Sequence, residues 1–283
     1  MAEAQRVTIV TGTSSGMGLH AAIELARRGD TVVATVRDPA RADRLRAAAA
    51  TAGVALDIRS LDVTDEAGAT TLIDAVARDH GGIDVLVNNA GRGSVGTAEQ
   101  LPMSEIAAQL EVNYLGPVRL AKAVLPVMRA AGRGRILTVT SVGGVVGQPF
   151  ADAYCGAKFA VEGFMQSLAP VAARVGVWVS VIEPAAVASD FVANVSRQAS
   201  PGPYEQTLQA YLSRTQAAFA NAQPAAEAGA AIAAAARSTT YRFRWQTSAA
   251  ASAFVGLSLA DLDGSSVLGQ TATWLDAQPD AHG

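Results

Sequence analysis

Short apolar runs alternate along the chain with longer segments whose apolar residues recur at helical spacing. The runs at 6–10, 31–36, 54–61, 84–87, 135–140 and 177–182 predict strands. The segments between them predict helices over 16–28, 41–50, 65–79, 104–131 and 153–174. Strands that are apolar almost throughout and that alternate with helices are typical of a parallel sheet covered on both faces. We therefore predict an α/β fold with a doubly wound parallel sheet.

The last third of the chain departs from this alternation. The segment 189–224 begins with small and polar residues and then resumes as a helix, with an apolar stripe of Tyr204, Leu208, Tyr211, Leu212 and Phe219. Another helix is expected from Pro224 to about Arg237, then a seventh strand over 241–245 and an irregular tail over 256–275. Since no change in composition marks a boundary, we predict a single domain over 1–283 with about seven strands.

Composition and charge narrow the class of protein. The chain has 283 residues, of which 50% are hydrophobic, and this is enough for a full core. A net charge of −3 gives no support for nucleic-acid binding, and no apolar run approaches the ~18 residues that span a bilayer. Cys155 is the only cysteine, so no internal disulfide is possible and the cytoplasm is the expected location. Because the three histidines are scattered, we predict no metal site.

A glycine-rich loop joins the first strand to the first helix. It runs Thr11-Gly12-Thr13-Ser14-Ser15-Gly16-Met17-Gly18. Glycines let a backbone turn sharply and approach a pyrophosphate, and the start of a helix supplies free N–H groups and partial positive charge. The strand–turn–helix context is the one that such a motif needs, although a structural turn with Ser and Thr caps is the alternative. The loop predicts a dinucleotide site that uses Gly12, Ser14, Ser15, Gly16, Met17 and Gly18.

Arg37 ends the second strand, where an acidic residue would hold a ribose 2′-hydroxyl. Arginine at this place suits a 2′-phosphate, so NADP(H) is preferred. Asp38 follows directly and leaves NAD(H) as the alternative. The other interpretation of Arg37 is a solvated strand end.

Tyr154 and Lys158 are four residues apart on one predicted helix, and Ser141 lies upstream. The spacing places both side chains on one helix face. A phenol titrates near pH ~10, so its use near neutrality requires a pKa lower by roughly 3 units, or about 4 kcal/mol. One positive charge at ~4 Å in a partly buried site supplies about that much. Alone, the pair is also typical of a surface helix. Of the 22 basic residues, however, only Lys122 and Lys158 are lysines, which favours a need for a compact ammonium group.

Together these motifs resemble the short-chain dehydrogenase/reductase family of the common one-domain type. The resemblance also rests on Asp62-Val63, on Asn88-Asn89-Ala90-Gly91 and on Asn113 in Val112-Asn113-Tyr114-Leu115-Gly116, and it covers nearly the whole chain. It implies catalysis by Asn113, Ser141, Tyr154 and Lys158. It also implies that the cofactor is held by the glycine loop and by Arg37, Asp62, Val63, Asn89, Ala90, Gly91, Tyr154, Lys158, Pro184, Val187 and Ser189. A less specific likeness points to the 17-beta-hydroxysteroid and retinol dehydrogenase branch.

The implied reaction is reversible hydride transfer between the nicotinamide and a carbonyl or alcohol. The resemblance implies that Tyr154 transfers the proton and that Ser141 hydrogen-bonds the substrate oxygen. It implies that Lys158 lowers the Tyr154 pKa and holds the nicotinamide ribose, while Asn113 supports a proton relay through water. It further implies a cofactor half over about 1–140, a catalytic and substrate half over about 141–283, and a homodimer or homotetramer.

One segment departs from the family pattern. In Pro184-Ala185-Ala186-Val187-Ala188-Ser189, Ala185 replaces the usual glycine and makes a positive φ unfavourable. Ser189 replaces the usual threonine but keeps a hydroxyl. The cofactor is still expected to fit.

The expected substrate pocket is mostly apolar, with no cluster suited to a carboxylate or phosphate group. A neutral, hydrophobic ketone, aldehyde or secondary alcohol is therefore favoured. The segment 189–223 is expected to be a mobile lid, with simple helix packing as the alternative. The expected substrate contacts are Ser94, Ser141, Gly143, Gln148, Phe150, Tyr154, Phe191, Tyr204, Leu208 and Tyr211.

Two rival functions remain open. One is a catalytically silent NADP(H)-binding sensor or scaffold, against which the intact Ser/Tyr/Lys set argues. The other is an epimerase or dehydratase of the extended relatives, for which the chain after the sixth strand is too short.

Overall fold

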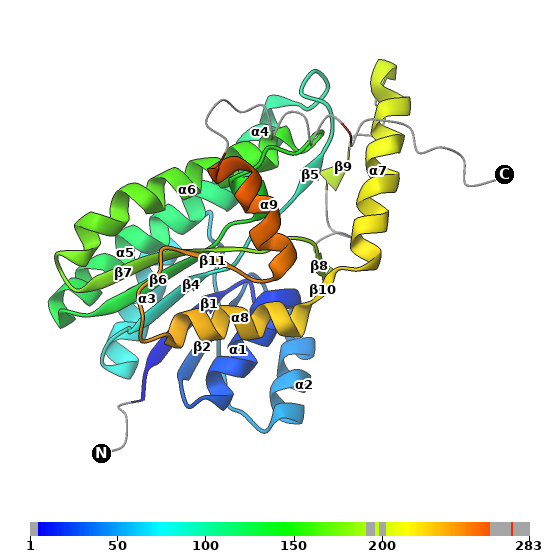
Figure 1. Ribbon diagram of the computed structural model, residues 1–283. Helices are drawn as coiled ribbons and strands as arrows, with labels where there is room; N and C mark the ends of the chain where they lie inside the picture. Colours follow the sequence, from blue (N-terminus) through cyan, green and yellow to red (C-terminus); the bar gives the residue numbers. More distant parts are fainter. Residues whose placement is uncertain (1–4, 191–195, 198–201, 261–272, 274–283) are drawn as a thin grey trace.

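The computed structural model describes residues 5–190, 196–197, 202–260 and 273, and one seven-stranded sheet forms its centre (Figure 1). The strand order is β11-β7-β6-β4-β1-β2-β3, and every neighbouring pair is parallel. This arrangement confirms the predicted doubly wound sheet. The strands are β1 Val7–Thr11, β2 Thr31–Val36, β3 Asp57–Ser60, β4 Val85–Asn88, β6 Gly134–Val139, β7 Val177–Glu183 and β11 Arg244–Gln246.

Helices cover both faces of the sheet (Figure 1). On one face are α1 Gly16–Arg27, α2 Asp43–Ala52 and α8 Ala225–Arg237, whose Ile23, Leu45 and Ile232 share a core with strand residues. On the other face, buried Leu72, Leu120 and Met165 come from α3 Glu66–His80, α5 Gly116–Ala131 and α6 Asp152–Ala173. The central strands are apolar on both sides because both sides are covered.

The chain moves from β1 outward through β2 and β3, and β4 then returns to the other side of β1. The strand order therefore reverses between β1 and β4. In open sheets of this kind, ligands bind beyond the carboxyl ends of the strands at such a switch point.

The helix expected over 104–131 is interrupted. It consists of α4 Met103–Leu110, the π-helical turn η2 Glu111–Leu115 and α5. Pro117 explains the interruption, because it has no N–H to donate to the carbonyl of Asn113, four residues earlier. A π-helical turn relieves such a break, and turns of this kind occur often at functional sites.

The C-terminal part is more regular than expected. Helix α9 Ala249–Leu259 begins where the Ser248 hydroxyl accepts the backbone N–H of Ala251 at 3.2 Å. The irregular tail expected from residue 256 is therefore wrong over 256–259, because the apolar Ala251 and Val255 are buried in a cluster with Val142 and Val145. Residues 261–272 of that tail lie outside the described part of the chain.

Shorter elements complete the described structure. Helix α7 Glu205–Ala220 stands beside the sheet near its carboxyl edge, as Figure 1 shows. Two small parallel pairs lie nearby, between β5 Ser94–Val95 and β9 Ser196–Arg197, and between β8 Val187–Ala188 and β10 Gln223–Pro224. The remaining turns are η1 Pro39–Arg41, η3 Val142–Gly144 and η4 Gly202–Tyr204. Among the described residues, the helices are too short or too polar to cross a membrane.

Candidate active site

The predicted site residues follow the carboxyl ends of four adjacent strands. The glycine loop follows β1, Asn89-Ala90-Gly91 follows β4, Ser141 follows β6 and Pro184 follows β7. Since parallel strands end at the same edge, these segments meet where the strand order reverses.

Hydrogen bonds from the end of β4 fix the glycine loop. The Asn89 amide donates to the carbonyl oxygens of Thr11 and Gly12 at 2.9 and 3.1 Å. Gly12 has a φ of +68°, and a Cβ on it would lie 2.8 Å from the Cα of Ala90. Only glycine satisfies both conditions, so the loop can lie directly against β4.

The glycine loop also faces the segment after β7. A Cβ on Gly16 would meet the Cβ of Ser189 at 3.2 Å, so the two predicted cofactor segments lie in contact. The Ser15 side chain makes no capping hydrogen bond at the start of α1, which leaves the first N–H groups of the helix for a ligand. A close backbone cradle at a helix start fits a dinucleotide pyrophosphate.

The other predicted cofactor residues occupy the same edge. Met17 packs on the core of one sheet face, and Val63 is buried against Gly116 at the start of α5. Ala185 does not have a positive φ, as expected for a residue with a Cβ, and lies beside the α9 cluster. Pro184 accepts a backbone hydrogen bond from Val142 at 3.0 Å, whereas Val187 lies in β8 and Ser14 is exposed.

Arg37 is exposed just after β2, close enough to Asp62 for its charge to act there. Hydrogen bonds from Thr64 lower the pKa of the Asp62 carboxyl, and Arg37 lowers it further. The carboxylate of Asp38 is engaged elsewhere, because it accepts the backbone N–H of Ala40 at 2.9 Å at the start of η1. At the end of β2, the Arg37 guanidinium is therefore the charged group available to a ligand.

Asn113 lies in the π-helical turn and is fully buried. Its amide nitrogen donates to the Arg92 carbonyl at 2.8 Å and to Gln109 Oε1 at 2.9 Å, while its oxygen accepts the Arg92 N–H at 3.1 Å. Gly91 leaves room for both side chains, because a Cβ there would lie 3.0 Å from Asn113 Oδ1 and 3.7 Å from Lys158 Nζ. The structure thus brings the side chains of Asn113 and Lys158 together beside one glycine.

Ser141 and Tyr154 form the centre of the site. A hydrogen bond joins their side chains, and Ser141 Oγ accepts the Gly143 N–H at 2.9 Å. A Cβ on Gly143 would lie 3.3 Å from both Gln148 Nε2 and Tyr154 Cε1. Four predicted substrate contacts, Ser141, Gly143, Gln148 and Tyr154, therefore meet at one place.

Lys158 is buried and donates from Nζ to the Val139 carbonyl oxygen at 3.0 Å, 5.8 Å from the centroid of the Tyr154 ring. Burial lowers the pKa of Lys158 to about 8, opposed by the charge of Glu162. Burial raises the pKa of Tyr154, and the hydrogen bond with Ser141 opposes that rise. The expected net lowering of the Tyr154 pKa is wrong for this arrangement, because the sequence-based arithmetic omitted the cost of burying a phenolate.

The structure brings some of the other expected substrate residues together and leaves others apart. Phe150, at a φ of +58°, has its ring 5.5 Å from that of Tyr211, which is buried on α7 beside Leu208. Ser94 is 3% exposed, and its hydroxyl has no partner among the described residues. Tyr204, in contrast, is 40% exposed and donates its hydroxyl to Glu99 at 3.0 Å, so the structure does not bring it to the other contacts. Phe191 lies outside the described residues.

A group of buried charges behind Lys158 was not predicted from the sequence. Glu162 accepts from Thr140 Oγ1 at 2.5 Å and from Arg244 at 2.7 Å, and Arg244 also contacts Glu183. A signal was present in the sequence, because Glu162 is four residues after Lys158 in an otherwise mostly apolar helix segment.

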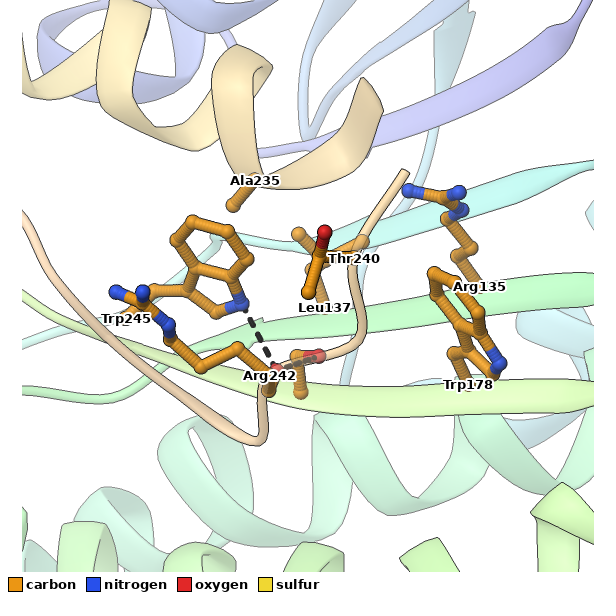
Figure 2. Close-up of a pocket in the computed structure, with 8 residues that line it drawn as sticks. Arg135, Leu137, Trp178, Ala235, Thr240, Arg242 and Trp245 are labelled. Atoms are coloured by element: carbon orange, nitrogen blue, oxygen red, sulfur yellow. Dashed lines mark hydrogen bonds between the residues drawn. The ribbon is translucent and has the colours of Figure 1, made fainter. Parts of the chain in front are cut away.

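A small pocket elsewhere in the sheet contains none of the predicted site residues (Figure 2). It lies at β6, β7, α8 and the segment that leads into β11, where the Arg135 guanidinium lies 4.7 Å from the centroid of the Trp178 ring. Trp245 donates from Nε1 to the Arg242 carbonyl at 2.8 Å. The first contact joins β6 to β7, and the second joins β11 to the segment that leads into it.

Known proteins match both the sequence and the fold. The family model for short chain dehydrogenases matches residues 6–200. Human retinol dehydrogenase 8 is 39% identical over 216 residues, or 74% of this chain and 68% of that protein. Human 17-beta-hydroxysteroid dehydrogenase type 1 is 42% identical over 199 residues, or 68% of this chain and 60% of that protein.

Solved structures agree over most of the chain. A short-chain dehydrogenase from Streptomyces avermitilis has a TM-score of 0.81 at 30% identity, covering 96% of this chain and 97% of its own. An actinorhodin polyketide ketoreductase with NADPH has a TM-score of 0.74 at 28% identity, covering 87% of this chain and 97% of its own.

Proposed function

This chain belongs to the short-chain dehydrogenase family, and on that premise we propose that it is an NADP(H)-dependent oxidoreductase. It moves a hydride between the nicotinamide and a neutral, hydrophobic ketone, aldehyde or secondary alcohol. One observation carries the proposal: the hydrogen-bonded pair of Ser141 and Tyr154 lies beside buried Lys158 at the edge of the sheet that holds the glycine loop. The names of the retinol and 17-beta-hydroxysteroid relatives support a hydrophobic alcohol or ketone as substrate.

The chain supplies the proton and the orientation for this reaction. When bound, the cofactor supplies or accepts the hydride. Because burial raises the pKa of Tyr154, its phenol keeps its proton at neutral pH and acts as the acid in carbonyl reduction. The Ser141 hydroxyl holds the same substrate oxygen. The ammonium group of Lys158 stabilises the phenolate that remains after the proton has left.

The preference for NADP(H) rests on Arg37. Arg37 is exposed just after β2, the strand that pairs with β1 ahead of the glycine loop, and a guanidinium pairs with phosphate through two parallel hydrogen bonds. Asp38, the residue that favoured NAD(H) in the sequence, is engaged at the start of η1. We assign the cofactor half of the domain to about 1–140 and the catalytic and substrate half, which also contributes Pro184, Val187 and Ser189 to the cofactor site, to about 141–283.

The substrate side supports a neutral and apolar ligand. Phe150, Leu208 and Tyr211 supply apolar surface near Gln148 and Ser141. Arg92, the cation nearest to the loop after β4, is paired with Glu105 at 2.9 Å. We propose that the segment 189–223, which includes α7, covers the substrate as a lid.

The test is consumption of NADPH with a panel of hydrophobic ketones and aldehydes, measured by NADPH absorbance. We expect turnover of apolar carbonyl compounds and little with carboxylate-bearing analogues of the same size. Tight NADPH binding without turnover of any carbonyl compound would instead favour the sensor or scaffold function.

We also propose that the chain assembles as a homodimer or homotetramer. Phe159 and Val171 on α6 are apolar side chains exposed to solvent, and a second copy that packs on this helix would cover them. Light scattering on the purified protein tests this, and the mass of one 28.9 kDa chain would contradict it.

A further inference from the structure

Four charged side chains lie together behind the reaction site. Lys158 and Glu162 are one turn apart on α6, Glu183 ends β7, and Arg244 begins β11. Glu162 is 4% exposed and Glu183 is fully buried. Two cations and two carboxylates give this cluster a net charge of zero when all four are ionised, and the reaction proposed above uses only Lys158.

The cluster is held by contacts at the ends of three strands. Lys158 Nζ donates to the Val139 carbonyl at 3.0 Å, and Glu162 Oε1 accepts from the adjacent Thr140 hydroxyl at 2.5 Å. Ser141 is the next residue along the chain. The side chains of Lys158 and Glu162 therefore both reach the end of β6, the strand that positions Ser141.

Arg244 connects the helix to the next strand. Its Nη1 lies 2.7 Å from Glu162 Oε2 and also contacts Glu183, which in turn accepts from Gln246. On the other side, Gly144 lets η3 approach this helix turn, because a Cβ there would meet Glu162 Cγ at 3.0 Å. Glu162 is thus fixed from both sides.

A buried ammonium group needs a counter-charge. Burial penalises an ion strongly, and an unpaired buried lysine loses its proton instead. Burial lowers the pKa of Lys158 to about 8, and Glu162 acts against that fall. Burial raises the pKa of Glu162 to about 7 with support from Glu183, whereas Thr140 and Arg244 act against that rise. Thr140 and Arg244 therefore both favour the ionised state of Glu162.

The phenol and thiol groups around Tyr154 are uncharged at neutral pH, and the Asp152 carboxyl acts on Cys155 and Tyr211 rather than on Lys158. Burial raises the pKa of Cys155 to about 11 and that of Tyr211 to about 12, and it also raises the pKa of Tyr154. Asn113, which lies beside Gly91 as Lys158 does, carries no charge. Among the described residues, Glu162 is the carboxylate that acts on Lys158.

We propose that Glu162, held in place by Arg244, is a positioning residue that acts as the buried counter-charge of Lys158 and keeps it an ammonium ion. The inference rests on the proposed function for its role in turnover, but the state of Lys158 can be measured without turnover. The residues that support the reaction then include Arg244 of β11, an edge strand of the sheet, in addition to Tyr154 and Lys158 of α6.

The chain offers a direct measurement because it contains two lysines, Lys122 and Lys158. Isotope-labelled lysine gives one NMR signal for each, and the two can be followed through a pH titration of the whole protein. In Glu162→Gln the titration midpoint of Lys158 should fall by about one pH unit, because an adjacent opposite charge favours the charged form. The Lys122 midpoint should not move.

Glu66→Gln is the matched control. Glu66 lies 3.3 Å from Lys122, with side chains 66% and 76% exposed, so its removal should leave the Lys158 midpoint unchanged. Glu162→Asp keeps the negative charge, so its Lys158 midpoint should stay close to that of the wild type. An unchanged Lys158 midpoint in folded Glu162→Gln would overturn the proposal.

If Glu162→Gln does not fold, Glu183→Gln is the second variant. Glu183 raises the pKa of Glu162, so its removal favours the ionised Glu162 and should leave the Lys158 midpoint at or above that of the wild type. A fall of the Lys158 midpoint by about one unit in Glu183→Gln would contradict the assignment of the counter-charge to Glu162.

Turnover supplies the second readout. Since the charged form of Lys158 is the active one, carbonyl reduction should decline as the pH rises through the Lys158 midpoint, and in Glu162→Gln this decline should begin about one pH unit lower. If the wild type is inactive but the Lys158 midpoint still falls by about one pH unit in Glu162→Gln, the proposed function alone is contradicted. An active Glu162→Gln with an unshifted pH profile would defeat this inference alone.

Discussion

The cofactor side and the substrate side of this molecule are built in different ways. On the cofactor side, close backbone contacts shape the site. Gly12 lies against Ala90, and Asn89 holds the loop through two carbonyl oxygens. On the substrate side, side chains from distant segments meet, as Phe150 does with Tyr211 of α7. A site made by backbone tolerates few residue types, whereas a site made by side-chain contacts can change with its ligand.

This contrast predicts different outcomes when each side is changed. Variants of the reaction centre should reduce turnover but not cofactor binding, variants of the loop should reduce cofactor binding, and variants of the α7 contacts should alter substrate preference alone.

Ser141→Ala should have a larger effect than the loop and α7 variants. The substitution removes the hydroxyl that holds the substrate oxygen and leaves the Gly143 N–H without its acceptor. Turnover should fall by about 10²–10³-fold, with NADPH affinity unchanged. Steady-state kinetics together with NADPH titration measure both quantities. A loss of NADPH binding equal to the loss of turnover would place Ser141 on the cofactor side.

Gly12→Ala should weaken NADPH binding. The new Cβ meets the Ala90 Cα at 2.8 Å and the residue must keep a positive φ, a strain of about 1–3 kcal/mol, so affinity should fall by roughly tenfold to a hundredfold. Gly53→Ala is the control, because Gly53 has a similar φ of +67° with open space around it. That variant should lose a little stability and keep its NADPH affinity; equal losses of affinity would contradict the close-approach argument.

Arg37→Gln should change the choice of cofactor. Loss of a charge-assisted pair with a 2′-phosphate costs about 1.5–3 kcal/mol, so the preference for NADPH over NADH should fall by roughly tenfold or more. Arg46→Gln, which breaks the exposed pair with Asp43 on α2, serves as the control and should keep the preference. An unchanged cofactor ratio in Arg37→Gln would show that Arg37 is a solvated strand end.

Tyr211→Ala should give the smallest effect, confined to the substrate. It removes the ring that contacts Phe150, so KM for a bulky apolar ketone should rise about tenfold while NADPH affinity stays the same. Tyr204→Phe removes only a surface hydroxyl that bonds Glu99 and should be silent. A stronger effect at Tyr204 than at Tyr211 would contradict the inward orientation of α7.

The comparison also shows which features a sequence can predict. The alternating strands, the glycine loop and the convergence of Ser141 with Tyr154 follow from local patterns, because each depends on residues near in the chain or on parallel topology. The π-helical turn at Asn113 depends on a local signal as well, the missing N–H of Pro117, which helical periodicity does not register.

Tertiary burial explains the remaining differences. The direction of the Tyr154 pKa depends on how completely the phenol is desolvated, and no spacing along the chain reports that. The pairing of Glu162 with Arg244 joins residues 82 positions apart. Tyr204 and Tyr211 share one apolar stripe in the sequence, yet Tyr211 is buried and Tyr204 is exposed. Tyr204 lies in η4, before α7 begins, and its hydroxyl bonds Glu99 at the surface.

The most direct test of the central claim follows the hydride itself. Wild type and Tyr154→Phe are each mixed with NADPH that carries deuterium at the transferred position and with a hydrophobic ketone, and the product is analysed by mass spectrometry. We predict an alcohol with deuterium on the carbinol carbon from the wild type. From Tyr154→Phe we predict a yield lower by about 10²–10⁴-fold, although that variant binds NADPH equally well. Equal yields of labelled alcohol from the two proteins would contradict the claim that the Tyr154 phenol carries the proton.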